Sequence, residues 1–114
     1  MQYLLLIHDD PASYYDGLME EYGAFTQALA ASGALVGANQ LQPADTATTV
    51  SVREGETFCT DGPFIETKEA LGGYYLVDVG SLDEAIEWAA KLPSARIGHI
   101  EVRPVVMREA EVAA

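Results

Sequence analysis

The sequence predicts an α+β fold in which two helices are interleaved with short strands. Two segments carry apolar residues at every third or fourth position, which is typical of amphipathic helices. The segments around them are short and rich in apolar and β-branched residues, as strands are. A predicted hairpin lies between the two strand–helix units. This order is that of the split βαβ, or ferredoxin-like, fold: βαββαβ with an inserted β-hairpin.

The first part of the chain predicts a strand followed by a helix. Residues 3–7, with the sequence YLLLI, form a short apolar run that is typical of a strand buried on both faces. Asp10 and Pro11 predict the start of a helix, as N-cap and first-turn proline, and Gly33 predicts its end. One apolar stripe recurs along this helix at steps of three and four: Tyr15, Leu18, Tyr22, Phe25 and Leu29.

The middle of the chain predicts strands and a hairpin. Residues 34–41 predict the second strand. Residues 47–54 and 56–60 are rich in β-branched side chains and are joined around Gly55, so they predict a hairpin. Residues 73–79 predict the strand that follows it.

The last third of the chain predicts a helix and a final strand. Ser81 and Glu84 form an S-x-x-E capping box, which predicts the start of the second helix, and Pro93 predicts its end. Residues 99–106 predict the last strand. Pro104 favours an edge position for this strand, because proline has no amide hydrogen to donate to a neighbour. In such a fold the helices cover one face of the sheet and leave the other bare.

The strands are apolar on both sides, which predicts that a second copy of the chain covers the bare face. In the first strand, Leu4 and Leu6 alternate with Tyr3, Leu5 and Ile7. A monomer would expose one of these faces as a large apolar patch, and such patches usually mark interfaces. We therefore expect a homodimer joined sheet to sheet with two-fold symmetry, forming a dimeric α/β barrel.

Length and composition predict one acidic domain spanning residues 1–114. The chain has 114 residues, of which 49% are hydrophobic, and a formal net charge of −12. Such a surface repels polyanions, so neither nucleic acid nor an anionic membrane is expected as a partner. No signal-peptide pattern is recognised, and the longest apolar run is too short to span a bilayer. Cys59, expected to be a small buried residue, suits a reducing compartment, and we expect a cytoplasmic protein.

A long block of sequence resembles the DGPF group of YCII-related proteins. The block is TDGPFIETKEALGGYYLVDV at residues 60–79, and residues 35–50 and 100–105 are similar to the group as well. The resemblance implies a ferredoxin-like domain that dimerises into a barrel. Relatives include enzymes that act on small ring-derived acids by proton transfer or halide elimination, and the DGPF group is associated with alternative sigma factors. Where YCII relatives have a helix histidine paired with an aspartate, this chain has Tyr22.

The DGPF motif contains the first candidate catalytic residue, Asp61. A carboxylate in a partly buried turn can act as a general base. Alternatively, Asp61, Gly62 and Pro63 are turn chemistry alone. The two interpretations are compatible, because a turn can present a side chain to a cavity. We expect Asp61 at the rim of the barrel and facing a cavity, with Gly62, Pro63 and Phe64 as ligand contacts, or Phe64 as a core or lid residue, and Gly72-Gly73 resuming the sheet beside the first strand.

Four more residues are candidates for acid–base chemistry or ligand binding. His8 ends the first strand, where it either assists proton transfer or faces solvent, and Tyr22 is a second assisting group. Arg103 could hold an anion bidentately if its face of the last strand meets the dimer cavity, and otherwise belongs to a polar edge. Lys68 lies in a charge cluster and could hold a ligand carboxylate as a point charge.

The sequence carries no metal or nucleotide motif. The two histidines are far apart, and neither H-x-x-x-H nor C-x-x-C occurs, so no metal is expected. The double glycine belongs to neither a G-x-G-x-x-G nor a Walker loop, so no nucleotide cofactor is expected.

Two functions are compatible with these patterns. In the first, the dimeric barrel binds a small organic anion and performs cofactor-free proton transfer of the isomerase or lyase type, with Asp61 as base and His8 or Tyr22 assisting. In the second, the protein is a non-catalytic ligand sensor or adaptor that contacts a regulatory protein such as an alternative sigma factor. An enclosed pocket with convergent titratable groups favours the first function.

Overall fold

The computed structural model describes residues 1–108, which form an antiparallel sheet, two α-helices and a projecting hairpin. The sheet comprises β1 (Gln2–Asp9), β2 (Leu35–Gln40), β5 (Ala70–Asp78) and β6 (His99–Pro104). Their order is β2-β5-β1-β6, and all neighbours are antiparallel. The first strand and the strand after the hairpin are therefore central, which confirms the predicted ferredoxin-like α+β fold. β6 lies at an edge, as Pro104 predicted.

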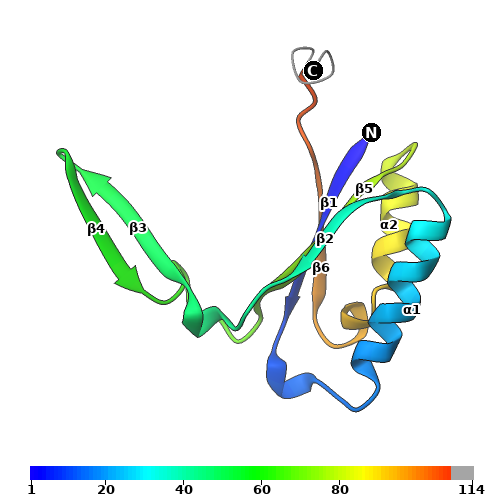
Figure 1. Ribbon diagram of the computed structural model, residues 1–114, viewed down its shortest axis with the longest axis horizontal. Coiled ribbons are helices and arrows are strands. Elements are labelled where there is room, and N and C mark those ends of the chain that lie inside the picture. The colour runs from blue at the N-terminus through cyan, green and yellow to red at the C-terminus, as the bar shows by residue number, and fades with distance from the viewer. Residues whose placement is uncertain (109–114) are drawn as a thin grey trace.

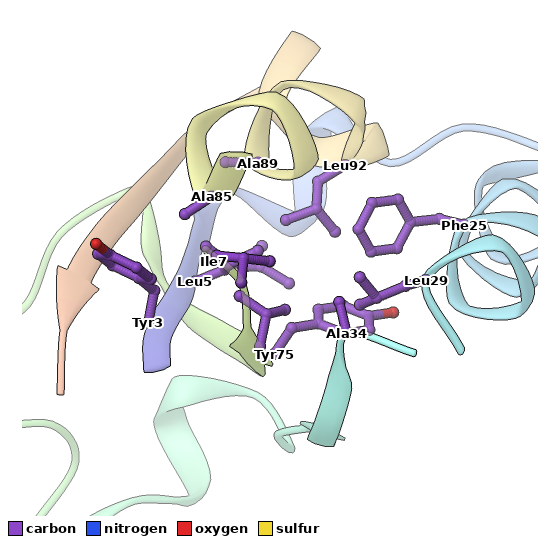
Figure 2. Packing of buried hydrophobic residues seen from close by; sticks show 12 residues of the cluster. Tyr3, Leu5, Ile7, Phe25, Leu29, Ala34, Tyr75, Ala85, Ala89 and Leu92 are labelled. Carbon is purple, nitrogen blue, oxygen red and sulfur yellow. The ribbon is translucent and has the colours of Figure 1, made fainter. Parts of the chain in front are cut away.

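Both helices lie on one face of the sheet, as Figure 1 shows. α1 spans Leu18–Ala31 and α2 spans Leu82–Lys91. The ring of Phe25 meets the rings of Tyr75 and Trp88 edge to face, at centroid distances of 5.1 and 5.9 Å. Figure 2 shows the core that results between helices and sheet. It comprises Tyr3, Leu5, Ile7, Phe25, Leu29, Ala34, Tyr75, Val77, Val79, Ala85, Ala89 and Leu92.

The other face of the sheet carries no helix in the described part of the chain (Figure 1). Leu4 and Leu6 point to this face, and both are half-buried. They lie opposite Leu76 and Tyr74 of β5, so the centre of the face is apolar. The two-sided apolar character predicted from the sequence is confirmed, and the second copy expected to cover this face stays a prediction.

β3 (Thr48–Arg53) and β4 (Glu56–Asp61) form the predicted hairpin, which we call the arm. Its turn has positive φ at both Glu54 and Gly55, at 52° and 78°, as a type I′ turn requires. The arm projects away from the sheet and helices in Figure 1. The radius of gyration is accordingly 16.3 Å, against about 13 Å for a compact chain of this length. Cys59 lies on the arm and is exposed, contrary to expectation, because the arm has no core of its own.

The first helix begins later than the sequence predicted. Asp10 does cap a turn, since its side chain accepts a hydrogen bond from the Ala12 amide at 2.9 Å. That turn is a short 3₁₀ segment, Pro11–Ser13, and α1 starts only after Gly17, whose φ is 92°. The physical reason is that the chain must cross from the end of β1 to the helix layer before the helix can pack on the sheet.

The second helix begins as predicted. The Ser81 hydroxyl accepts a hydrogen bond from the Glu84 amide at 3.2 Å. The Glu84 carboxylate accepts from the Gly80 amide at 3.3 Å, one residue before the cap. Neither helix in residues 1–108 is long and apolar enough to cross a membrane.

Candidate functional site

A cavity lies between α1 and the sheet, near the end of β1. Its volume is about 330 Å³, which is within the range of small-molecule sites. Residues of β1, β2 and β5 line one side, and residues of α1 and of the turn before it line the other. The lining combines apolar groups, four tyrosines and a carboxylate: Ile7, Asp9, Tyr14, Leu18, Met19, Tyr22, Gly23, Thr26, Ala38, Asn39, Gln40, Gly72, Gly73, Tyr74 and Tyr75.

The carboxylate of this cavity is Asp9, which is only 4% exposed. Asp9 is the last residue of β1, and strand alternation places its side chain on the same face as Ile7. Its Oδ1 accepts a hydrogen bond from the Tyr14 hydroxyl at 2.8 Å, and its Oδ2 accepts one from the Ser94 hydroxyl at 2.7 Å. These two donors replace water around a group that is costly to bury unpaired.

Tyr22 joins the same hydrogen-bond chain from α1. Its hydroxyl donates to the Ser94 Oγ at 2.5 Å, and Ser94 in turn donates to Asp9. Ser94 is fully buried and follows Pro93, in the turn between α2 and β6. Two hydroxyl groups from separate segments therefore donate to the Asp9 carboxylate, and a third, that of Tyr22, donates to Ser94.

Two glycines leave room for Asp9. A methyl group on Gly72 would lie 3.1 Å from Asp9 Oδ1. One on Gly98 would lie 2.3 Å from the His8 carbonyl oxygen and 2.9 Å from Asp9 Cβ. Gly72 also lies at a register shift between β1 and β5, where a bulge lets the backbone approach the carboxylate.

The surroundings of Asp9 keep the hydroxyl groups of Tyr14 and Tyr22 protonated. Burial raises the pKa of the Tyr14 hydroxyl well above its ordinary value, and the hydrogen bond to Asp9 and the charge of Asp9 raise it further. Burial likewise raises the pKa of Tyr22, and the charge of Asp9 acts in the same direction, while the hydrogen bond to Ser94 partly offsets the rise. At neutral pH the site therefore holds neutral phenols beside a carboxylate.

The chemistry available in this cavity is hydrogen bonding and proton transfer. Its polar side chains are hydroxyls, amides and the Asp9 carboxylate. Within residues 1–108, no group of three or more His, Cys, Asp and Glu side chains is placed to hold a metal ion. A carboxylate beside phenols can accept a proton from a bound molecule and return it.

Comparison with known proteins identifies the family. The model of the YCII-related domain matches residues 1–109. This chain belongs to the YCII-related family. The finer assignment to the DGPF group rests on the motif and stays a prediction.

One sequence relative and one solved structure are similar to this YCII-related chain. An uncharacterised protein of Rhizobium meliloti (strain 1021) is 40% identical over 92 residues, which is 79% of this chain and 74% of the relative. The solved structure is that of TftG, the 5-chloro-2-hydroxyhydroquinone dehydrochlorinase of Burkholderia phenoliruptrix AC1100, in complex with 2,5-dihydroxybenzoquinone. Its superposition on this chain has a TM-score of 0.52 at 14% sequence identity and covers 96% of this chain and 98% of TftG. At this identity the likeness shows a shared fold.

Of the catalytic residues predicted from the sequence, only Tyr22 lines the cavity of this YCII-related chain. His8 lies next to Asp9 but points to the opposite, bare face of the sheet, where its Nε2 is 3.2 Å from Glu101 Oε1. Arg103 is exposed on that bare face and pairs with Glu101. The predicted grouping of Asp61, His8 and Tyr22 is thus not formed within one chain.

Asp61 ends the arm and does not reach the cavity. Its expected turn toward a cavity is not found within the chain, because the strand pairing continues through Thr48 and Asp61 and the side chain stays exposed. The irregular backbone begins only at Gly62, whose φ is 97° and whose amide donates to the Ala47 carbonyl oxygen at 2.7 Å. The turn chemistry predicted for the motif is therefore present, one residue later than the aspartate.

The remaining candidate ligand contacts lie outside the cavity as well. Phe64 is 84% exposed and is therefore no core residue, Lys68 is exposed, and Pro63 is half-buried. The sheet resumes beside β1 already at Ala70, which pairs with Asp9, so the double glycine lies within β5, at the bulge, and does not begin the strand as predicted.

Asp9, Tyr14 and Ser94 are site residues that the sequence did not predict. One signal for Asp9 was available, because it continues the buried alternation of Tyr3, Leu5 and Ile7 and is thus a charged residue at a core position. No local pattern marks Ser94, which is 85 residues from Asp9 in the chain.

Proposed function

We propose that this YCII-related protein binds a small organic molecule in the Asp9 cavity and moves a proton on it without a cofactor. The observation that carries the proposal is the buried Asp9 carboxylate, held by two hydroxyl donors at the wall of a cavity of about 330 Å³. Titratable groups that converge in a pocket are typical of sites of acid–base chemistry.

In this proposal Asp9 is the base. Each of its oxygens accepts one hydrogen bond from the protein, and a carboxylate has room for about four, so lone pairs stay free for a ligand. Tyr14 and Ser94 fix the orientation of the carboxylate, and Tyr22 fixes Ser94. A base that is already oriented needs little reorganisation when a proton is transferred.

The fold relative supports a small ring compound as the ligand. The solved complex of TftG holds 2,5-dihydroxybenzoquinone, and its enzyme removes chloride from a hydroxylated ring, as its name states. A ring of this size is compatible with the cavity found here and with its apolar and tyrosine lining.

The ligand need not be the anion that the sequence predicted. That prediction depended on Arg103 and Lys68, and neither residue lines the cavity. The proposal therefore keeps the small organic ligand and the proton transfer and moves the base from Asp61 to Asp9.

Native mass spectrometry of the purified protein, followed by proton-exchange measurements in D₂O, tests the proposal. Molecules that co-purify are identified and returned to the protein, and deuterium incorporation into them is followed by NMR. We expect the protein to accelerate the exchange and Asp9→Asn to reduce the rate by about a hundredfold or more, the usual share of a general base.

Asp10→Asn is the matched control, because it removes the same charge from the next residue, outside the cavity. It should exchange protons at the original rate. Asp61→Asn should do the same. Loss of exchange in Asp61→Asn with retention in Asp9→Asn would return the catalytic role to the DGPF motif.

A non-catalytic sensor or adaptor that contacts an alternative sigma factor is a second candidate function. The arm favours it, since Val50 and Val52 lie on one face of a projecting hairpin and are 59% and 56% exposed. Such apolar groups on a protruding element are typical of protein contacts. Tight ligand binding without proton exchange in any variant would support this candidate over catalysis.

A further inference from the structure

The lining of the Asp9 cavity carries a negative charge and no positive one. Among the described residues that line it, Asp9 is a carboxylate, and there is no lysine, arginine or histidine. The net charge of −12 on the whole chain adds to the negative potential in the cavity. An anionic ligand would lose its hydration beside a buried carboxylate and would gain no opposite charge in return.

The hydrogen-bond directions leave acceptors free. Tyr14 donates its proton to Asp9, and Tyr22 donates its proton to Ser94. The phenol oxygens therefore keep lone pairs, and the Asp9 carboxylate has further acceptor positions. A ligand that brings several N–H donors would satisfy more of these groups than one that brings acceptors.

Tyrosine rings complete this acceptor-rich lining. Tyr14, Tyr22 and Tyr75 line the cavity, whereas the ring of Tyr74 points to the bare face of the sheet, beside Leu6. The Tyr75 hydroxyl is engaged with the Thr26 hydroxyl at 2.7 Å, which holds the Tyr75 ring in place. The face of a phenol ring attracts cations, and several rings around one site form a cage for an ammonium group.

We propose that the ligand of this cavity is an organic cation, namely an ammonium compound with an apolar body, whose charged nitrogen lies against Asp9. The inference rests on the proposed function, because it specifies the ligand of the same cavity. The carboxylate, the free phenol lone pairs and the ring faces all favour a positive, hydrogen-donating group at one end. Leu18, Met19 and Ile7 provide the apolar contacts at the other parts of the lining.

Three probes of similar shape and different charge test the inference: phenethylamine, phenethyl alcohol and phenylacetate. Each is titrated into the protein, and the amide NMR shifts of Gly23, Gly72 and Gly73, which line the cavity, report binding. We expect phenethylamine to bind at least about tenfold more tightly than phenylacetate, since tenfold corresponds to about 1.4 kcal/mol and a close charge pair in a partly buried site exceeds this. Phenethyl alcohol should lie between them.

Asp9→Asn should bring the three affinities together, whereas Asp10→Asn should keep the preference for the cation. Because both variants lower the net negative charge equally, their difference separates the cavity from general attraction by an acidic protein. If Asp9→Asn fails to fold, the order of the probes on the unaltered protein at high ionic strength decides the question, because salt screens the general attraction by the acidic surface. Equal or tighter binding of phenylacetate overturns the inference and leaves the cavity a ligand site. If no probe shifts the three amides, the proposed ligand site itself is wrong.

Discussion

At the scale of single residues, Asp9 is stabilised by groups that leave it little freedom. Two hydroxyl groups satisfy its oxygens, and the backbone of Gly98 lies against its Cβ. On the side of Gly98 the packing is close, so no void there absorbs an added group. Substitutions around Asp9 should therefore have large and specific effects.

Gly98→Ala should destabilise the protein by roughly 1–3 kcal/mol, the usual cost of overpacking. The added methyl group would lie 2.3 Å from the His8 carbonyl oxygen, so β1 or the turn before β6 must move. Urea denaturation measures the loss. Gly23→Ala is the matched control in α1, because the added methyl group there would meet no atom within 4 Å. This substitution should raise stability by about 1 kcal/mol, since alanine favours a helix over glycine by that amount. Equal effects of the two substitutions would show that crowding near Asp9 is unimportant.

Tyr14→Phe should change how stability depends on alkaline pH. The pKa of Tyr14 is raised in the folded protein, so its contribution is complete below the unfolded pKa of about 10 and declines as pH rises through that value toward the folded pKa. The substituted protein should be less stable at neutral pH by about 1 kcal/mol, because Asp9 loses a donor. It should then lose less stability between neutral and strongly alkaline pH. Denaturation curves that stay parallel over this range would contradict the raised pKa.

At the scale of elements, α2 is the helix whose start is most clearly encoded. Ser81 accepts from the Glu84 amide, and an acidic first turn faces the positive end of the helix dipole. Two apolar residues of α2, Leu82 and Ile86, are 48% exposed each, because the short helix touches the sheet mainly through Ala85 and Ala89.

Ser81→Ala should therefore cost about 1 kcal/mol of stability, since one amide of the first turn loses its acceptor. The denaturation midpoint measures the change. Ser13→Ala, at an exposed serine in the turn before α1, is the matched control. It should leave the free energy of unfolding within about 0.5 kcal/mol of the original. An unchanged midpoint in Ser81→Ala would mean that water replaces the cap without cost.

The arm is a separate two-stranded sheet, and within residues 1–108 no layer packs on it. A two-stranded hairpin alone is marginally stable in water. The arm nevertheless exposes apolar groups, including Phe58 at 47%. Its type I′ turn accounts for its shape, and we predict that another molecule covers its apolar groups.

At the scale of the whole molecule, the bare sheet face and the arm together predict a homodimer. Leu6 lies at the centre of the bare face, between Tyr74 of β5 and Glu101 of β6. A two-fold pair should bury roughly 2,000 Å² or more, and light scattering at micromolar concentration should give twice the chain mass. A monomeric mass for the unaltered protein would contradict the prediction.

Leu6→Lys should convert the dimer to a monomer, because a charge would be buried unpaired at the interface. Ile86→Lys places the same change on the outer surface of α2, where Ile86 is 48% exposed, and should leave the dimer intact. Circular dichroism checks that both variants keep the fold. A dimer that survives Leu6→Lys would place the interface elsewhere.

The local structure could be predicted from short stretches of sequence. Short runs of apolar and β-branched residues predicted the strands, the glycine of the Glu54-Gly55 turn predicted the hairpin, and Ser81 with Glu84 predicted α2. These features follow from forces that act within a few residues, such as capping, backbone sterics and side-chain periodicity. The late start of α1 is the exception, because the path from β1 to the helix layer set it and the Asp10 cap was used by a shorter turn.

The candidate site was decided by the tertiary structure alone. Asp9 meets Ser94, and Ser94 meets Tyr22, across sequence separations of 85 and 72 residues. No local pattern encodes such contacts, since they arise only when strand order and helix packing bring the segments together. The DGPF motif attracted attention because turn chemistry is conspicuous in a sequence, yet the extended pairing of β4 holds Asp61 on the arm. A buried aspartate at the end of an apolar strand is inconspicuous, and only the folded chain shows that hydroxyl groups from distant segments surround it.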